Sequence, residues 1–188
     1  MTSSEPRRLQ FLAEASQTHM DMTSDKYLLG ALLDSWDRNN KILVNLLLAL
    51  PDGGLDARAT KGSPSVTQMF SHIHYARLVS VAENVPEFAT KLPEEWAIER
   101  EPNHMAEMLN ASAKVVRVAV NGRLHASRDL DLHYDHPILF LQHMIWHEGY
   151  HHGQIKLALK TSGHPISDDV AGPVTWDIWM DKKSKSSK

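Results

Sequence analysis

The chain has 188 residues, and its 20 Lys and Arg against 23 Asp and Glu give a formal net charge of −3 at pH 7. With no Lys/Arg cluster larger than that of the tail 182–188, this balance gives no sign of the basic patch that is typical of proteins that bind nucleic acid or anionic membranes. The sequence contains no cysteine, which excludes disulfides, a cysteine nucleophile and zinc held by thiolates. Any metal ion must therefore be bound by histidine and carboxylate side chains.

No stretch of the sequence is long and apolar enough to cross a membrane. The longest apolar run, 42–50, is interrupted by Asn45 and is far shorter than the roughly 20 residues that a membrane-spanning helix needs. The first residues include Arg7 and Arg8 but no apolar segment of the kind found in signal peptides. We therefore expect a cytoplasmic protein with no membrane partner.

Two helices are predicted in the first half of the chain. Apolar residues recur at helical spacing over 25–49, and Pro51 with the two glycines that follow ends this helix. The second predicted helix begins near Ser63, a plausible N-cap, with Pro64 in the first turn. The stretch 84–102 contains three prolines and predicts a long connection with a short turn around 94–98.

Two further helices are predicted in the second half. The third covers 103–120, and Asn121 with Gly122 resembles a helix end. The fourth begins after His136, at Pro137, and continues to Lys160. No alternating apolar pattern predicts a strand, so we expect an all-α four-helix bundle over 22–163. Residues 1–21 would form an N-terminal extension, and 164–188 a C-terminal extension with a disordered Lys/Ser tail.

The fourth helix carries the residues that point to chemistry. At about 100° per residue, His147, Glu148 and His151 all lie in its apolar sector. Two imidazoles one helical turn apart can converge on one metal ion, although hydrogen-bonded core histidines are the simpler alternative. On the second helix, His72 and His74 flank the apolar face about symmetrically, and periodicity does not choose between them as a third ligand.

His147, Glu148 and His151 also spell H-E-x-x-H, the pattern of zinc peptidases. The extended form of that pattern requires glycine and histidine where this chain has Gln154 and Leu157. A peptidase would have to take its third ligand from Asp168 or Asp169, and no predicted strand is available to bind an extended peptide. A metallopeptidase is therefore the weakest of the hypotheses.

Arg77 lies one turn beyond Ile73, near the buried face of the second helix. An arginine in such a place requires a carboxylate or an anionic ligand. We favour a structural salt bridge and keep an anionic group of the substrate as the alternative.

Two segments, 65–77 and 143–155, resemble the DinB/YfiT superfamily of metal-dependent four-helix-bundle proteins. Ser71, His72 and Ile73 match its small-His-aliphatic step, and His147 and His151 match its H-x-x-x-H pattern. The basic-Gly-Gln sequence that follows in the family begins here with His152, where an arginine is usual. The resemblance covers about 25–163.

The resemblance implies a function for these residues. It selects His72 over His74 and implies that His72, His147 and His151 bind zinc or nickel, in what is commonly a homodimer. Such a site suits a hydrolase or a thiol-dependent transferase that acts on a small molecule, with a low-molecular-weight thiol as cosubstrate. Glu148 is then a candidate base and Arg77 a candidate contact for a substrate anion. The alternative is a non-catalytic metal-binding stress-response protein.

Overall fold

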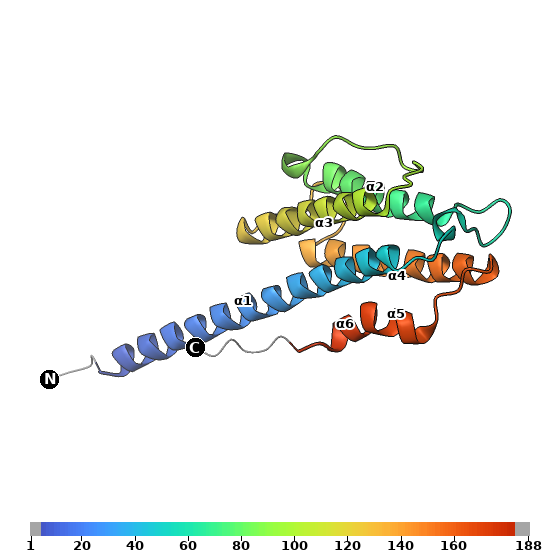
Figure 1. The fold of residues 1–188 in the computed structure, drawn as a ribbon. Helices are drawn as coiled ribbons and strands as arrows, with labels where there is room; N and C mark the ends of the chain where they lie inside the picture. Colours follow the sequence, from blue (N-terminus) through green and yellow to red (C-terminus); the bar gives the residue numbers. More distant parts are fainter. Residues whose placement is uncertain (1–4, 183–188) are drawn as a thin grey trace. The chain divides into compact units, whose positions relative to one another are not determined.

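The computed structural model describes residues 5–182, and the side chains of 25–182. Within this range the chain is all-α and contains no strand, as the sequence predicts. The long helices are α1 (Glu5–Leu48), α2 (Val66–Asn84), α3 (Pro102–His125) and α4 (Pro137–Thr161), shown in Figure 1. Shorter elements are the 3-10 turns η1 (Gly54–Asp56) and η2 (Pro86–Phe88) and the helices α5 (Asp168–Val174) and α6 (Asp177–Met180).

The chain divides into two compact units, Met1–Ser35 and Trp36–Lys188. The described part of the first unit is a helical stretch of α1. The second unit contains the rest of α1 and all other elements. Every candidate site residue belongs to this second unit.

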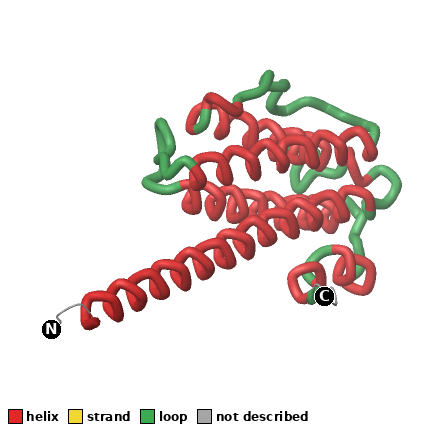
Figure 2. Tube along the Cα trace, turned by 90° about the vertical axis from the view of Figure 1, so that its left-hand side faces the viewer, coloured by secondary structure: helices red, strands yellow, loops and turns green. Residues whose placement is uncertain are grey.

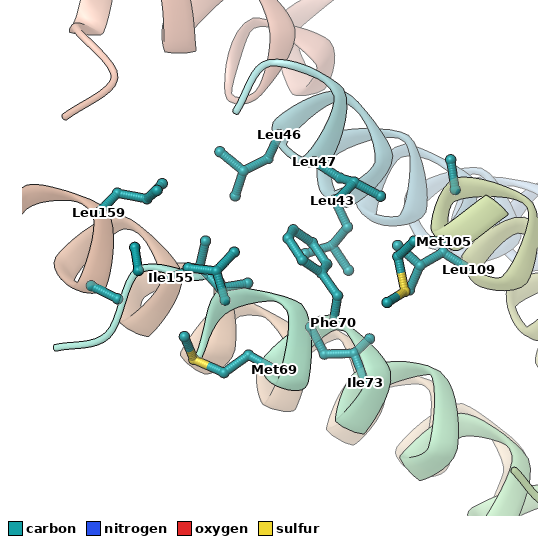
Figure 3. Packing of buried hydrophobic residues seen from close by; sticks show 14 residues of the cluster. Leu43, Leu46, Leu47, Met69, Phe70, Ile73, Met105, Leu109, Ile155 and Leu159 are labelled. Atoms are coloured by element: carbon teal, nitrogen blue, oxygen red, sulfur yellow. The ribbon is translucent and has the colours of Figure 1, made fainter. Parts of the chain in front are cut away.

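The hydrophobic core of the second unit draws side chains from α1, α2, α3 and α4 (Figure 3). Figure 3 shows Phe70 of α2 pointing toward the leucines of α1. Burying one such large apolar side chain stabilises a fold by about 1.5–3 kcal/mol. The cluster consists of Leu43, Leu46, Leu47, Ala57, Val66, Met69, Phe70, Ile73, Met105, Ala106, Leu109, Ile155, Ala158 and Leu159.

Helix α2 is in contact with both α3 and α4, and α3 also contacts α4. Figures 1 and 2 show these helices running alongside one another, with loops joining their ends. This packing brings the middle of α2 beside the middle of α4, although the two helices lie far apart in the sequence. Within the described residues, no helix combines the length and the apolar character that a membrane span requires.

The predicted helix boundaries hold well at α4 and at the end of α1, and less well elsewhere. Helix α1 begins at Glu5, so part of the expected N-terminal extension is helical. Helices α5 and α6 were not predicted, and the end of the Lys/Ser tail, 183–188, lies outside the described residues. The turn expected around 94–98 is present at Glu95 and Trp96.

The predicted N-cap of α2 is wrong by two residues. Ser65, not Ser63, caps the helix: its side chain accepts from the backbone N–H of Gln68, and the Gln68 side chain accepts from the backbone N–H of Ser65 at 3.1 Å. This reciprocal pair is a capping box, which satisfies two backbone donors together. Pro64 consequently precedes the helix.

The predicted end of α3 is also wrong, since the helix continues through Asn121 and Gly122 to His125. A Cβ atom on Gly122 would lie 2.7 Å from the ring of Phe88 in η2. The glycine therefore makes room for a close contact and does not end the helix.

Candidate metal centre

Three histidines from two helices bring their ring nitrogens together. Helix α2 supplies His72, and α4 supplies His147 and His151 one turn apart. Nε2 of His147 lies 3.3 Å from Nε2 of His72 and 3.1 Å from Nε2 of His151. All three possible ligand atoms lie within 4.8 Å of one another. The structure thus brings together the three residues that the sequence analysis selected.

The spacing of these nitrogens fits a zinc-sized ion. Nitrogens bound tetrahedrally to one zinc at roughly 2.0–2.1 Å are separated by roughly 3.4 Å. The two measured separations, 3.1 and 3.3 Å, are close to that value. A chain of N–H···N hydrogen bonds would give similar distances, so the orientation and protonation of the rings provide the further test.

His72 is held in place by two residues of the connection between α2 and α3. Its Nδ1 lies 2.9 Å from Oε1 of Glu95, and its ring stacks on Trp96 with centroids 4.4 Å apart and planes 4° apart. A carboxylate on Nδ1 fixes the proton there and leaves Nε2 as the free lone pair, as in many zinc sites. Neither Glu95 nor Trp96 was predicted as a site residue. The sequence indicated only a short turn at 94–98, and no pattern there related these two side chains to His72.

The other two rings are kept neutral by their surroundings. Burial, followed by the neighbouring His151 and His72, lowers the pKa of His147 to about 4. Burial also lowers the pKa of His151, and His72 contributes in the same direction. Both imidazoles are therefore unprotonated at pH 7, which is the form that binds a metal ion.

Arg77 and Glu148 form a buried ion pair with two hydrogen bonds. Nε of Arg77 donates to Oε1 of Glu148 at 2.6 Å, and a terminal nitrogen donates to Oε2 at 2.8 Å. The two side chains are 0% and 1% exposed. The second terminal nitrogen of Arg77 donates to Asn40, to the carbonyl of Leu109 and to Ser112. Arg77 therefore has the carboxylate partner that the sequence favoured. Each of its three guanidinium nitrogens donates a hydrogen bond to an acceptor of the protein.

The remaining candidates lie outside the triad. His74 is buried, and burial followed by Arg77 lowers its pKa. His152 lines a separate cavity of about 240 Å³ together with Glu148 and Trp176. Asp168 is 85% exposed at the start of α5 and lies 3.7 Å from Lys156. The geometry thus gives the His147–His151 pair a third neighbour in His72 rather than in Asp168 or Asp169.

A cavity of about 290 Å³ lies against the triad at His151. Trp96 and Tyr150 contribute aromatic walls, and Gln154 contributes a polar one. Ligand cavities are commonly apolar hollows with a few polar groups, at or above this size. A small molecule could therefore approach the histidines from this side.

No protein-family model, curated protein or solved structure matched the chain. Its function is inferred from the geometry of the triad and from the motifs that carry its residues.

The Arg77–Glu148 pair predicts a large effect on stability. Arg77→Met should lower the free energy of unfolding by about 3–5 kcal/mol, because it leaves the Glu148 carboxylate buried without a counter-charge. Arg100→Met is the control, since Arg100 and Asp56 form an ion pair that is 64% and 60% exposed, and it should change stability by less than about 1 kcal/mol. Urea denaturation measures both. Equal effects of the two substitutions would contradict the role given to the buried pair.

The lowered pKa of His147 predicts how the metal-free protein responds to acid. Between pH 6.5 and about 4 the unfolded chain binds a proton at His147 that the folded chain does not. Stability should therefore be lost as pH falls through this window, and His147→Gln should remove part of that loss. His125→Gln, at an exposed position at the end of α3, is the control. Denaturation curves measured from pH 4 to 7 would refute the prediction if His147→Gln left the slope unchanged.

Proposed function

We propose that the chain is a DinB/YfiT-like protein in which a four-helix bundle holds one divalent metal ion, zinc or nickel, on His72, His147 and His151. The observation that carries the proposal is the convergence of three imidazole nitrogens from two helices, with Nε2–Nε2 separations of 3.1 and 3.3 Å. The Glu95 carboxylate on Nδ1 of His72 supports it, because metal-binding histidines commonly have such a partner. The resemblance in the helix motifs supports the same three residues and suggests a homodimer.

The proposed activity is that of a hydrolase or a thiol-dependent transferase acting on a small molecule in the cytoplasm. An ion held only by neutral imidazoles keeps its full charge and makes a bound water or low-molecular-weight thiol more acidic. The chain contributes the neutral state of His147 and His151, the orientation of His72 by Glu95, and the adjoining cavity of about 290 Å³. The absence of cysteine is compatible with a thiol that comes from a cosubstrate.

In this proposal Glu148 and Arg77 act as positioning residues. Glu148 stands between the two ligands of α4, and its carboxylate is bound to Arg77 of α2 and to Asn39 of α1. Hydrogen bonds from both of these partners hold the carboxylate in one position between α1, α2 and α4. The pair fixes α4 against α2, and with it the relation of His147 and His151 to His72.

The second candidate is a non-catalytic metal-binding stress-response protein. It is favoured by the position of the triad, because an ion bound there would link α2 to α4 and so stabilise the fold. In that case the cavity at His151 would hold only solvent.

Metal uptake tests the triad itself. His147→Ala should abolish stoichiometric binding of zinc or nickel, since two imidazoles bind an ion far more weakly than three. His74→Ala is the matched control, because His74 is a buried histidine of α2 that lies outside the triad, and this variant should keep full occupancy. Elemental analysis of the purified, folded proteins gives the occupancy. Full metal content in His147→Ala would refute the site.

A transfer assay tests the transferase form of the proposed activity. The metal-loaded protein is incubated with 1-chloro-2,4-dinitrobenzene and, in turn, with cysteine, glutathione, 2-mercaptoethanol or benzyl mercaptan. In the reaction a C–S bond forms, the C–Cl bond breaks and the thiol proton leaves with chloride. A transferase should accelerate at least one reaction, and chelation of the metal should remove the acceleration. No acceleration with any thiol would contradict the transferase and leave the hydrolase and the non-catalytic protein as candidates.

A further inference from the structure

The walls of the cavity beside the triad are mainly apolar and aromatic. The described residues that line it are Ala59, Ser63, Pro64, Met69, Trp96, Tyr150, His151, Gln154 and Leu157. Trp96 is 38% exposed and Tyr150 is 55% exposed, so both rings offer apolar area that a ligand could cover. Aromatic rings of this kind add attraction for a flat or apolar group beyond the area that is buried.

Charged groups are absent from these walls: among the described lining residues there is no Lys, Arg, Asp or Glu. Two charged residues outside the lining contact the triad or a lining residue. Glu95 is bound to His72, and the guanidinium of Arg58 donates to the carbonyl of Ser63 at an exposed position. Arg77, which the sequence analysis considered for a substrate anion, is fully buried and bound to Glu148. A negative charge on the part of a ligand that lies against these walls, away from the metal ion, would therefore lose hydration without gaining a cation from the lining.

We infer that the cavity at His151 selects a ligand with an uncharged aromatic body, which reaches the triad with a metal-binding head. The inference rests on the proposed metal site and adds the class of molecule that the site accepts. The apolar body would lie between Trp96 and Tyr150, near Met69, and polar atoms of the ligand would meet Ser63 or Gln154. Trp96 also stacks on His72, so the wall of the cavity and the orientation of the metal ligand depend on the same side chain.

Three hydroxamic acids with one metal-binding head test this selectivity. Benzohydroxamic acid has an uncharged aromatic body, acetohydroxamic acid has only a methyl group, and 4-carboxybenzohydroxamic acid has an added negative charge. Isothermal titration calorimetry on the metal-loaded protein should give benzohydroxamic acid at least about tenfold tighter binding than acetohydroxamic acid, from burial of the ring. The carboxylated compound should bind at least about tenfold more weakly than benzohydroxamic acid.

A matched pair of substitutions on α4 locates the effect in the cavity. Leu157 lines the cavity and is 52% exposed, whereas Leu139 lies outside the described lining and is 50% exposed. Leu157→Arg places a cation at the wall and should improve binding of the carboxylated compound at least fivefold relative to benzohydroxamic acid. Leu139→Arg should leave the ratio unchanged. Both side chains are half-exposed, so neither variant is expected to impair folding.

The outcomes distinguish this inference from the metal site on which it rests. Absence of bound metal by elemental analysis would overturn both. A fully loaded protein that binds the three compounds equally, or prefers the carboxylated one, would overturn the inference alone. If that preference disappeared in Arg58→Gln, an anionic ligand bound through Arg58 would replace the proposed one.

Discussion

The arrangement of the helices depends on one buried guanidinium. Arg77 of α2 binds Glu148 of α4 through two hydrogen bonds, Asn40 of α1 at 2.9 Å and the carbonyl of Leu109 in α3 at 2.7 Å. It also lies 4.9 Å from the ring centroid of Trp36 in α1. A charge taken out of water is tolerated only when its donors are satisfied, and here the acceptors come from the three other long helices, α1, α3 and α4. Sliding or rotating any of these helices would leave a donor or the carboxylate unpaired.

This constraint extends directly to the triad. Arg77 follows His72 on α2, and Glu148 lies between His147 and His151 on α4. Fixing the ion pair therefore fixes the two helix faces that carry the imidazoles. In the triad, Nε2 of His147 lies 3.3 Å from that of His72 and 3.1 Å from that of His151, and such contacts contribute little attraction without a shared proton or cation. The Arg77–Glu148 pair therefore holds α2 and α4 in the relative position that keeps the three histidines together.

The errors of the sequence analysis have specific physical causes. Asn121 and Gly122 form a sequence that commonly ends helices, but the glycine serves the contact with Phe88, which is distant in the sequence. Two serines precede α2, and Ser65 with Gln68 has the S-x-x-Q spacing of a capping box, a local signal that the choice of Ser63 overlooked. Glu95 and Trp96 lie in a connection without periodicity, so no sequence pattern relates them to His72. For Gly122, and for Glu95 and Trp96, the missing information is a contact between segments whose local patterns are independent.

The sequence by itself determined the helical class, the extent of α4 and the presence of Glu148 and His151 on its buried face with His147 half-buried beside them. The reason is that a period of 3.6 residues fixes the direction of each side chain within one helix. It also left His72 and His74 as alternatives until the resemblance chose between them. The tertiary structure decided that His72 meets the pair on α4, that Arg77 is bound to Glu148, and that an uncharged cavity adjoins His151. These features depend on how the faces of different helices meet. Periodicity within one helix contains no information about its neighbour.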